Sequence, residues 1–202
     1  MREYDRIAER YAATRSPTIG VSDVQAFART LPPRARILDL GCGDGVPITR
    51  ELVRQGFRVT ALDSSAEMIR RFRANLPGVP ARCERAETAQ FPDGSFDAAI
   101  AWGVLFHLAD ADQRSLIAKV SGWLVPGGRF LFTSGGEAGT REGAMEGVAF
   151  RYVSLGVDGY RRALVRSGVR LVRSYVGEGE NPTYVAEKPE ASRGDATASE
   201  AG

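Results

Sequence analysis

The segment that most constrains the fold is a short apolar strand pattern that runs directly into a glycine-rich turn. Residues 36–40 have the pattern of a buried strand, and glycines follow at positions 41, 43 and 45. Glycine tolerates positive φ and places no side chain between the backbone and a ligand. The residues from about Val46 to Gln55 predict a helix whose N-terminal amides point into the same space. The pattern therefore predicts a strand, turn and helix that bind a small, partly anionic ligand.

The spacing of the glycines separates two classes of ligand. A dinucleotide fingerprint reads G-x-G-x-x-G, whereas this loop reads Gly41-x-Gly43-x-Gly45 and follows Asp39 closely. A carboxylate at this position repels a pyrophosphate but attracts an ammonium group. The residues argue against NAD and favour a ligand that carries both a carboxylate and an amino group, such as S-adenosylmethionine.

A second strand pattern, Arg58 to Asp63, also ends on an acidic residue. It lies about twenty residues past the glycines, where an acid in a βαβ unit accepts hydrogen bonds from ribose hydroxyls. Ser64 and Ser65 supply an N-cap for a helix from Ala66 to Asn75. The alternative is that Asp63 is only a cap or turn residue, but the glycine loop favours ribose binding.

Four motifs follow one another along the chain. They are Asp39 to Gly45, Asp63 after the second strand, Phe96-Asp97 opening a fourth strand and Leu124 to Gly128 before a fifth. In this order they resemble those of class I S-adenosylmethionine-dependent methyltransferases, of the ubiquinone/menaquinone-methylase-like type, and the resemblance runs from about Tyr4 to Lys188. It implies a single-domain α/β fold with a Rossmann-like, doubly wound, seven-stranded sheet that is mostly parallel, with an antiparallel hairpin at its edge. The methyl donor would bind across the C-terminal ends of the parallel strands.

The resemblance implies a donor site built from the loops after the first four strands. Many relatives have an acid at the end of strand three, where this chain has Arg85, so that either Glu87 or only backbone groups of Ala86 would contact the adenine. Trp102 lies against the donor sulfonium, faces the acceptor or packs in the core. The residues expected to contact S-adenosylmethionine are Asp39, Gly41, Cys42, Gly43, Gly45, Asp63, Ser64, Met68, Ala86, Glu87, Ala101 and Trp102.

His107 is the only histidine of the chain. Its position resembles one where some relatives hold a histidine near the acceptor, and a general base there takes the proton of an acceptor hydroxyl. The alternative is a surface or helix-start histidine without a chemical role. Methyl transfer needs little acid–base chemistry, because the sulfonium is already activated, so in-line placement and exclusion of water should contribute most.

Three segments are expected to close the site over a small-molecule acceptor. The first is a helical lid over residues 1–34, the second is a long connection from Ser134 to Leu155 that reads as a mobile substrate loop, and the third is a hairpin turn before Tyr184. For each residue, a solvated loop position or a packed aromatic is the alternative. The candidate acceptor-binding residues are Tyr4, Tyr11, Ser134, Glu137, Tyr152, Asn181 and Tyr184.

The rest of the chain alternates strands and helices as a doubly wound sheet requires. The methyltransferase core is expected over residues 35–188, and the small polar residues 189–202 predict a disordered tail. Further strands are expected at 81–85, 96–101, 129–133, 169–177 and 183–187, and further helices at 112–124 and 156–167.

Composition narrows the choice of partners and location. A net charge of +2 gives no reason to expect nucleic acid or an anionic membrane as a partner. Residues 181–184, Asn-Pro-Thr-Tyr, are not placed after strand four, where amino-methylating nucleic-acid enzymes carry a similar signature. Cys42 and Cys83 suggest neither a disulfide framework nor a metal site. The N-terminus is charged and no apolar run spans a membrane, so we expect a cytoplasmic protein.

The sequence favours S-adenosylmethionine-dependent methyl transfer to an oxygen or nitrogen of a small molecule, with S-adenosylhomocysteine as the product. The alternative class is a non-catalytic binder of S-adenosylmethionine, or a nucleotide-dependent oxidoreductase on the same fold. The oligomeric state, monomer or homodimer, is left open.

Overall fold

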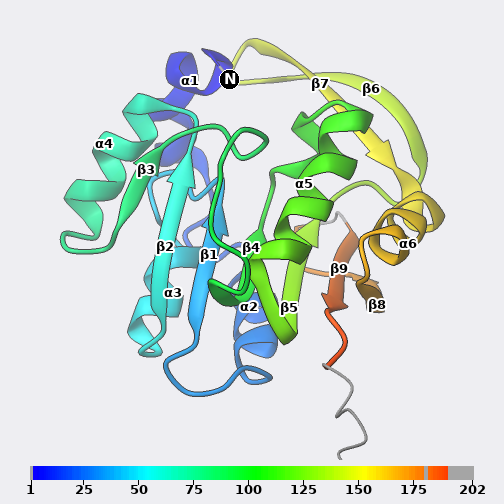
Figure 1. Ribbon diagram of the computed structural model, residues 1–202. Helices are drawn as coiled ribbons and strands as arrows, with labels where there is room; N and C mark the ends of the chain where they lie inside the picture. The colour runs from blue at the N-terminus through cyan, green and yellow to red at the C-terminus, as the bar shows by residue number, and fades with distance from the viewer. Residues whose placement is uncertain (1, 180–181, 191–202) are drawn as a thin grey trace, which may run out of the picture.

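The computed structural model describes residues 2–179 and 182–190. Its main sheet has seven strands in the order β3-β2-β1-β4-β5-β9-β8 (Figure 1). Strands β3, β2, β1, β4 and β5 pair in parallel, whereas β9 pairs antiparallel with both β5 and β8. This arrangement confirms the predicted fold with its antiparallel hairpin at the sheet edge. In sheet order the strands span Ala81–Cys83, Arg58–Asp63, Arg36–Leu40, Phe96–Ala101, Leu124–Thr133, Pro182–Glu187 and Arg170–Val176.

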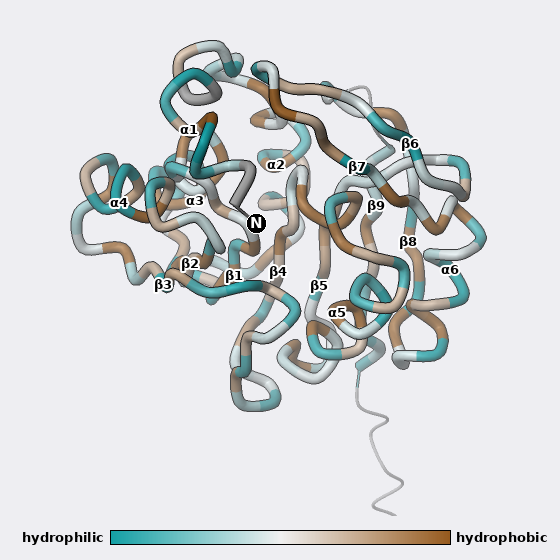
Figure 2. Tube along the Cα trace, turned by 90° about the horizontal axis from the view of Figure 1, so that it is seen from above, coloured by the Kyte–Doolittle hydropathy of each residue, from teal (hydrophilic) through white to brown (hydrophobic). Residues whose placement is uncertain are grey.

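Helices cover both faces of this sheet. Buried clusters place α2, α3 and α4 on one face and α5 and α6 on the other. Figure 2 looks at the molecule from above and shows hydrophobic residues along the strands between these two layers. The helices are α1 (Arg2–Thr14), α2 (Val21–Ala28), α3 (Ile48–Arg54), α4 (Ala66–Asn75), α5 (Asp110–Trp123) and α6 (Gly156–Arg166), and a short 3₁₀ helix, η1, spans Leu105–His107.

The apolar run of β1 follows from burial on both faces of the strand. Ile37 packs in the same cluster as Val24 of α2 and Ile48 of α3. Leu38 and Leu40 belong to the cluster that includes residues of α5 and α6. The side chains of a strand alternate between faces, so β1 lies between two dry layers. The glycine loop begins where the chain leaves these layers, directly after the carboxyl end of β1.

Most predicted boundaries agree with the structure, and the differences fall at the ends of elements. The helix after the glycine loop begins at Ile48 instead of Val46. Strand β5 begins at Leu124 and not at Arg129, because Leu124 already pairs with Phe96 across a register shift in the ladder. Helix ends and irregular ladders carry weak sequence signals, since a terminal residue changes few hydrogen bonds.

The prediction of a loop without regular structure from Ser134 to Leu155 is wrong over residues 138–155. Residues 138–155 form an antiparallel hairpin of β6 (Ala138–Met145) and β7 (Val148–Leu155). Its turn lies at Glu146 and Gly147, which have φ angles of 52° and 76°. Many glycines favoured a loop, but the alternating burial of β7 and its packing on α1 stabilise a strand that the glycines alone do not indicate.

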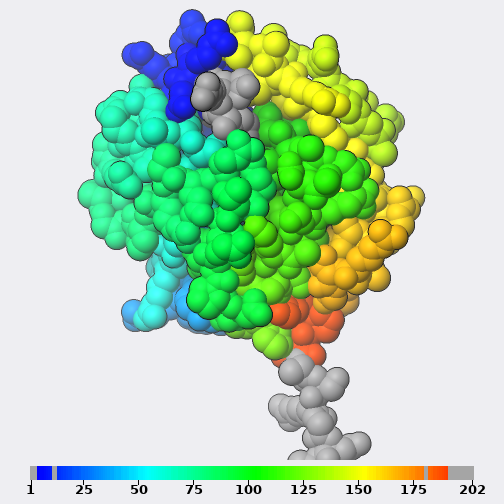
Figure 3. Space-filling view, turned by 45° about the horizontal axis from the view of Figure 1, so that its top comes forward, coloured from blue at the N-terminus to red at the C-terminus, as the bar shows by residue number. Residues whose placement is uncertain are grey.

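α1 and the β6–β7 hairpin lie side by side over the carboxyl ends of the central strands, α1 in blue and the hairpin in yellow (Figures 1 and 3). Ile7 of α1 packs with Val148 and Phe150 of the hairpin. On its other side, α1 presents Asp5 to the N-terminus of α4, where Ser65 Oγ donates to Asp5 Oδ1 at 2.5 Å. α1 therefore joins two halves of the molecule that are distant in sequence.

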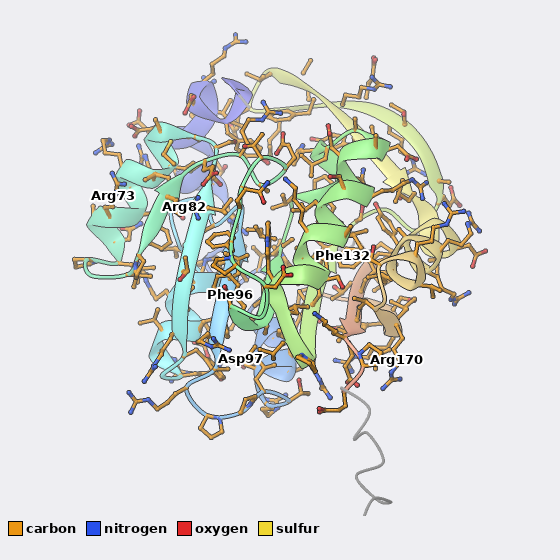
Figure 4. The ribbon with its side chains drawn as sticks, in the orientation of Figure 1. Arg73, Arg82, Phe96, Asp97, Phe132 and Arg170 are labelled. Atoms are coloured by element: carbon orange, nitrogen blue, oxygen red, sulfur yellow. The ribbon has the colours of Figure 1, made fainter. Side chains whose placement is uncertain are left out.

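The opposite end of the sheet carries different chemistry. Asp97, labelled in Figure 4, accepts a hydrogen bond from the Arg36 side chain, with Nη2 and Oδ1 2.9 Å apart. Arg36 also donates its backbone N–H to Asp97 Oδ2 at 2.7 Å. This pair fixes the amino ends of β1 and β4 beside each other, far from the glycine loop. The predicted fourth-strand motif thus has a structural role here.

A buried polar network joins α5, α6 and the end of β5. Tyr160 Oη donates to Gln113 Oε1 at 2.6 Å and also hydrogen-bonds Ser134 Oγ. Gln113 Nε2 donates to the carbonyl oxygens of Leu108 and Val153, at 2.9 Å each. Because Val153 belongs to β7, the network ties the hairpin to the helix layer. Phe132, labelled in Figure 4, lies beside this network on β5.

Removing the Tyr160 hydroxyl should weaken the fold measurably. We expect Tyr160→Phe to lower the free energy of unfolding by about 1–3 kcal/mol, because it leaves Gln113 Oε1 buried without its donor. Urea unfolding measures the change. Ser95→Ala is the control, since the Ser95 hydroxyl donates to the Pro92 carbonyl at 2.6 Å on the exposed surface. We expect about 0.5 kcal/mol or less for the control, and equal losses would contradict a role for burial.

Candidate functional site

A first cavity of about 430 Å³ opens at the carboxyl ends of β1, β2, β3 and β4. In an open α/β sheet, ligands bind at this edge, outside the strand ends. The lining comes from the loops after these strands and from α1, α4 and η1. Its residues are Tyr4, Arg15, Gly41, Gly43, Leu62, Asp63, Ser64, Met68, Arg85, Ala86, Glu87, Trp102, Gly103, Val104, His107 and Leu108.

The glycine loop is held against the end of β2 by backbone hydrogen bonds. The Gly41 and Cys42 amides both donate to the Leu62 carbonyl, at 2.8 and 3.0 Å. Gly41 has a φ of 69°, and a Cβ built there would lie 2.3 Å from Val104 Cγ2. Gly43 has a φ of 56°, but a Cβ there would meet no atom within 4 Å. Packing therefore requires glycine at position 41, whereas the open side of Gly43 belongs to the cavity.

Asp63 holds this loop and faces the cavity at the same time. Its Oδ2 accepts the Gly43 amide at 3.0 Å, and its Oδ1 accepts the Ser65 amide at 2.8 Å. Burial raises the pKa of Asp63 from its usual value, and the two amide hydrogen bonds oppose the shift. Ser65 caps α4 by accepting the Met68 amide at 3.1 Å, as predicted. Asp63 is thus a preorganised acceptor at the end of β2.

Asp39 lies behind the cavity wall. Its side chain is buried, and Thr49 Oγ1 of α3 donates to its Oδ2 at 2.5 Å. Burial raises the pKa of Asp39 to about 6, against the hydrogen bond from Thr49 and the nearby charge of Arg15. Arg15 lines the cavity, so the charges of Arg15 and Asp39 act on each other across the cavity wall.

Four of the predicted donor contacts lie outside the lining of the first cavity. Besides Asp39, the buried Cys42 points its thiol into the layer with Phe72, where burial raises the thiol pKa. Gly45 is required by packing, since a Cβ there would lie 2.6 Å from Leu76. Ala101 is fully buried in the sheet. These four residues support the cavity wall from the core side and do not face the cavity.

Eight predicted donor contacts do line the first cavity: Gly41, Gly43, Asp63, Ser64, Met68, Ala86, Glu87 and Trp102. Trp102 lines the cavity with part of its ring and is otherwise packed in the core, since it is only 9% exposed. A Cβ at Gly20 would lie 2.6 Å from its ring, so the chain before α2 packs closely on it. Glu87 Oε1 accepts from Arg85 Nε at 2.7 Å, which pairs the two charges at the end of β3.

Sequence reasoning missed several lining residues. The most informative is Arg15, which directly follows α1 and brings a cation into the first cavity. A lone arginine after a helix gives no motif, and only the docking of α1 shows where it points. The other lining residues outside the predicted set are Leu62, Arg85, Gly103, Val104 and Leu108.

A second cavity of about 730 Å³ adjoins the first. Tyr4, Gly103 and His107 line both cavities, so the two meet at these residues. The rest of the lining comes from η1, the hairpin and the connection after β5. It comprises Phe106, Gly135, Gly136, Glu137, Ala138, Gly139, Thr140, Arg141, Met145, Tyr152, Val153, Ser154 and Pro182.

An aromatic cluster occupies the junction of the two cavities. Tyr4 Oη and His107 Nε2 lie 3.0 Å apart, within hydrogen-bonding distance. The His107 ring also contacts Phe106, Phe150 and Tyr152, with ring centroids 4.7, 5.5 and 5.3 Å away. The cluster joins α1, η1 and β7, which lie far apart in the sequence.

The predicted acceptor residues divide into three groups. Tyr4, Glu137 and Tyr152 line the second cavity. The prediction for Ser134 and Tyr184 needs correction, because both are fully buried and line neither cavity. Tyr184 Oη donates to the Gly135 carbonyl at 2.8 Å, and its ring stacks on Phe132 in the core. The Tyr11 side chain and Asn181 lie outside the described residues, as does most of the predicted tail.

Within residues 2–179 and 182–190, no group of three or more histidine, cysteine, aspartate or glutamate side chains is arranged to hold a metal ion. No helix in the same residues is long and apolar enough to span a membrane.

The chain is similar in sequence to known methyltransferases. Residues 37–128 match the profile of a family described as a methyltransferase domain. An uncharacterised methyltransferase of Mycobacterium tuberculosis is 36% identical over 94 residues, which is 46% of this chain and 46% of that protein. A ubiquinone biosynthesis O-methyltransferase of Xanthomonas axonopodis is 33% identical over 112 residues, covering 53% of this chain and 46% of that protein. The chain spans about half the length of the curated relatives it matches.

Solved structures resemble most of the chain. The CcbJ methyltransferase of Streptomyces caelestis has a TM-score of 0.77 at 16% identity, covering 93% of this chain and 98% of that one. A didemethyltoxoflavin N-methyltransferase of Burkholderia thailandensis, solved with its substrate and S-adenosylhomocysteine, has a TM-score of 0.64 at 22% identity, covering 83% and 78%. At these identities the likeness shows the fold.

Proposed function

We propose that this chain, whose residues 37–128 match a methyltransferase-domain family, is a class I S-adenosylmethionine-dependent methyltransferase that transfers a methyl group to an oxygen or nitrogen of a small-molecule acceptor. The observation that carries the proposal is the pair of adjoining cavities. The first presents a glycine loop and an aspartate to a ligand, and the second meets it at Tyr4, Gly103 and His107. Donor and acceptor would meet at this junction.

The first cavity has the groups that the donor requires. We assign the ribose hydroxyls to Asp63, whose carboxylate is fixed by two amides at the end of β2. The adenine would lie by residues 85–87, and the amino acid part by Gly41 and Arg15. Arg15 suits the carboxylate of the donor, and the field of Asp39 suits its ammonium group. The zwitterion would thus have a cationic group in the cavity lining and an anionic group behind the wall.

The second cavity would hold the acceptor. When bound, S-adenosylmethionine supplies an already activated methyl group, so the chain's main contribution is to align the acceptor and exclude water. Tyr4 and His107 would move the proton of a hydroxyl acceptor. Tyr4 Oη takes that proton while its own passes to His107 Nε2, 3.0 Å away. α1 and the hairpin provide the cover, because both lie over the strand ends.

The names of similar proteins support either oxygen or nitrogen as the atom that receives the methyl group. One of them is named as a ubiquinone biosynthesis O-methyltransferase and another as an N-methyltransferase of didemethyltoxoflavin. The Tyr4–His107 pair favours an acceptor that must lose a proton, and both a hydroxyl and a protonated ring nitrogen meet that condition.

Titration calorimetry and a product assay test the proposal. We expect the protein to bind S-adenosylhomocysteine and to release it from S-adenosylmethionine when a suitable acceptor is present. Binding of NADH in place of S-adenosylhomocysteine would overturn the donor assignment. Donor binding without turnover on any compound of a phenol, amine and heterocycle panel would favour a non-catalytic binder.

Removing the Tyr4 hydroxyl probes the junction. We expect Tyr4→Phe to lower kcat about fivefold for a hydroxyl acceptor, the value of one neutral hydrogen bond, with little change in S-adenosylhomocysteine affinity. Initial rates at saturating donor give kcat. Tyr175→Phe is the control, since that residue lines neither cavity among those described. An unchanged kcat in Tyr4→Phe would remove Tyr4 from the proton path.

A further inference from the structure

The two cavities differ in the charges that line them. The first has Arg15, Asp63, Arg85 and Glu87, whereas the ionic side chains in the described lining of the second, apart from His107, are Glu137 and Arg141. These two pair with each other, with Arg141 Nη2 and Glu137 Oε2 3.2 Å apart. Their side chains are 81% and 86% exposed, so solvent screens them. The second cavity therefore presents almost no net field to a ligand.

The surface of the second cavity is aromatic in one part and free of side chains in another. Phe106, His107 and Tyr152 are in mutual ring contact, with the Phe106 and Tyr152 centroids 5.7 Å apart. Gly135, Gly136 and Gly139 line the same cavity through their backbone. A Cβ at Gly139 would meet no atom within 4 Å, so the space beside it is open. Aromatic rings and glycine backbone form flat surfaces in this cavity, and flat surfaces are complementary to a planar ligand.

We infer that the acceptor is a neutral, planar aromatic or heteroaromatic compound, bound with its ring system against Phe106 and Tyr152. The inference rests on the proposed function and names the substrate class of the same site. A charged acceptor would lose its hydration in the second cavity without gaining an unpaired counter-ion among the described lining residues. An aromatic ring gains edge-to-face or stacked contacts there, which a saturated ring does not. The volume of about 730 Å³ accommodates a multi-ring system.

The position of the reacting atom follows from the junction. The acceptor would point its oxygen or nitrogen to Gly103, Tyr4 and His107, which line both cavities. That atom forms the new bond to the methyl carbon while the carbon–sulfur bond breaks and its electron pair stays on sulfur. The acceptor proton leaves through Tyr4 to His107. Sulfonium and neutral acceptor thus become a neutral thioether and a neutral methylated ring compound, and the positive charge passes with the proton to His107 as an imidazolium.

A set of probes matched in size tests the class directly. 2-Naphthol and decahydro-2-naphthol share a hydroxyl and a carbon skeleton, and only the former is planar and aromatic. We expect 2-naphthol to bind the S-adenosylhomocysteine-loaded protein about tenfold more tightly in titration calorimetry. The charged analogues 2-naphthoate and 2-naphthylmethylammonium should bind more weakly than 2-naphthol. Tighter binding of the saturated alcohol or of either charged analogue would overturn the inference.

A variant localises the probe. Phe106 lines the second cavity and not the first, so we expect Phe106→Leu to weaken 2-naphthol binding about fivefold and to leave S-adenosylhomocysteine affinity unchanged. Phe91→Leu is the matched control, since Phe91 is also half-buried but packs with Phe96 and Trp123. The control should bind 2-naphthol as the parent does. Unchanged 2-naphthol binding in Phe106→Leu would place the probe elsewhere and overturn the inference.

The two proposals fail in different measurements. Absence of S-adenosylhomocysteine binding would overturn the proposed function. The affinities of 2-naphthol and decahydro-2-naphthol can still be compared on the protein without S-adenosylhomocysteine, and this comparison tests the preference for a planar ligand. Normal S-adenosylhomocysteine binding without a preference for the planar probe would overturn only the acceptor class.

Discussion

Asp63→Asn is expected to weaken S-adenosylhomocysteine binding about 100-fold. The carboxylate stands at the end of β2 in the first cavity and is held by the Gly43 and Ser65 amides. Hydrogen bonds to a charged group contribute about 1.5–3 kcal/mol each, and two ribose hydroxyls would donate to this one. The amide of asparagine keeps the size but removes the charge and one acceptor. Titration calorimetry measures the loss of affinity.

Asp44→Asn is the matched control for this change. Asp44 lies in the same loop and its Oδ1 accepts the Val46 amide at 3.1 Å, but it does not line either cavity. Its replacement should leave donor affinity within about twofold, because only a local turn changes. Circular dichroism should show both variants folded. A similar loss in the two variants would mean that loop charge, and not a specific contact of Asp63, determines binding.

Gly43→Ala is expected to weaken donor binding about tenfold or more while the protein remains folded. Its φ of 56° is costly for alanine, by about 1–2 kcal/mol, and the added Cβ would occupy open space on the cavity side of the loop. A donor whose amino acid part approaches the loop backbone would collide with that methyl group. Calorimetry with S-adenosylhomocysteine measures the affinity, and urea unfolding measures the strain.

Gly56→Ala separates strain from collision. Gly56 has a φ of 85° and a Cβ there also meets no atom within 4 Å, but it lies after α3, outside both cavities. Both variants should lose similar stability, and only Gly43→Ala should lose donor affinity. If Gly43→Ala binds the donor as tightly as Gly56→Ala does, the ligand does not approach the loop at this position.

Much of the sheet was predictable because its strands obey local rules. The boundaries Arg58–Asp63, Ala66–Asn75 and Phe96–Ala101 are the same in prediction and structure. Apolar runs, a serine cap and an acid at a strand end each depend on residues close in sequence. The hairpin of β6 and β7 was missed because β6 is exposed and rich in glycine, so its stability comes from β7 and α1.

The sequence signal for the site was clearest where its residues follow a strand directly. Asp63, Ser64 and the glycines Gly41 and Gly43 lie in the first cavity because the end of a parallel strand fixes the residues that follow. Ser134 follows β5 in the same way, yet its hydroxyl points to Tyr160 in the core. The direction of a side chain after a strand depends on the layer packed beside it, and one sequence does not show that layer.

Short-range patterns of burial, turns and caps were enough to predict the order of the strand motifs, the resemblance to methyltransferases, and the glycine loop and aspartate at the ends of β1 and β2. Which residues meet where the two cavities adjoin depends on tertiary packing. Tyr4, His107 and Tyr152 come together from α1, η1 and β7, elements far apart in the chain. Their contact requires two helix layers and a hairpin to pack over one sheet edge, and that packing is a property of the whole core and not of any segment.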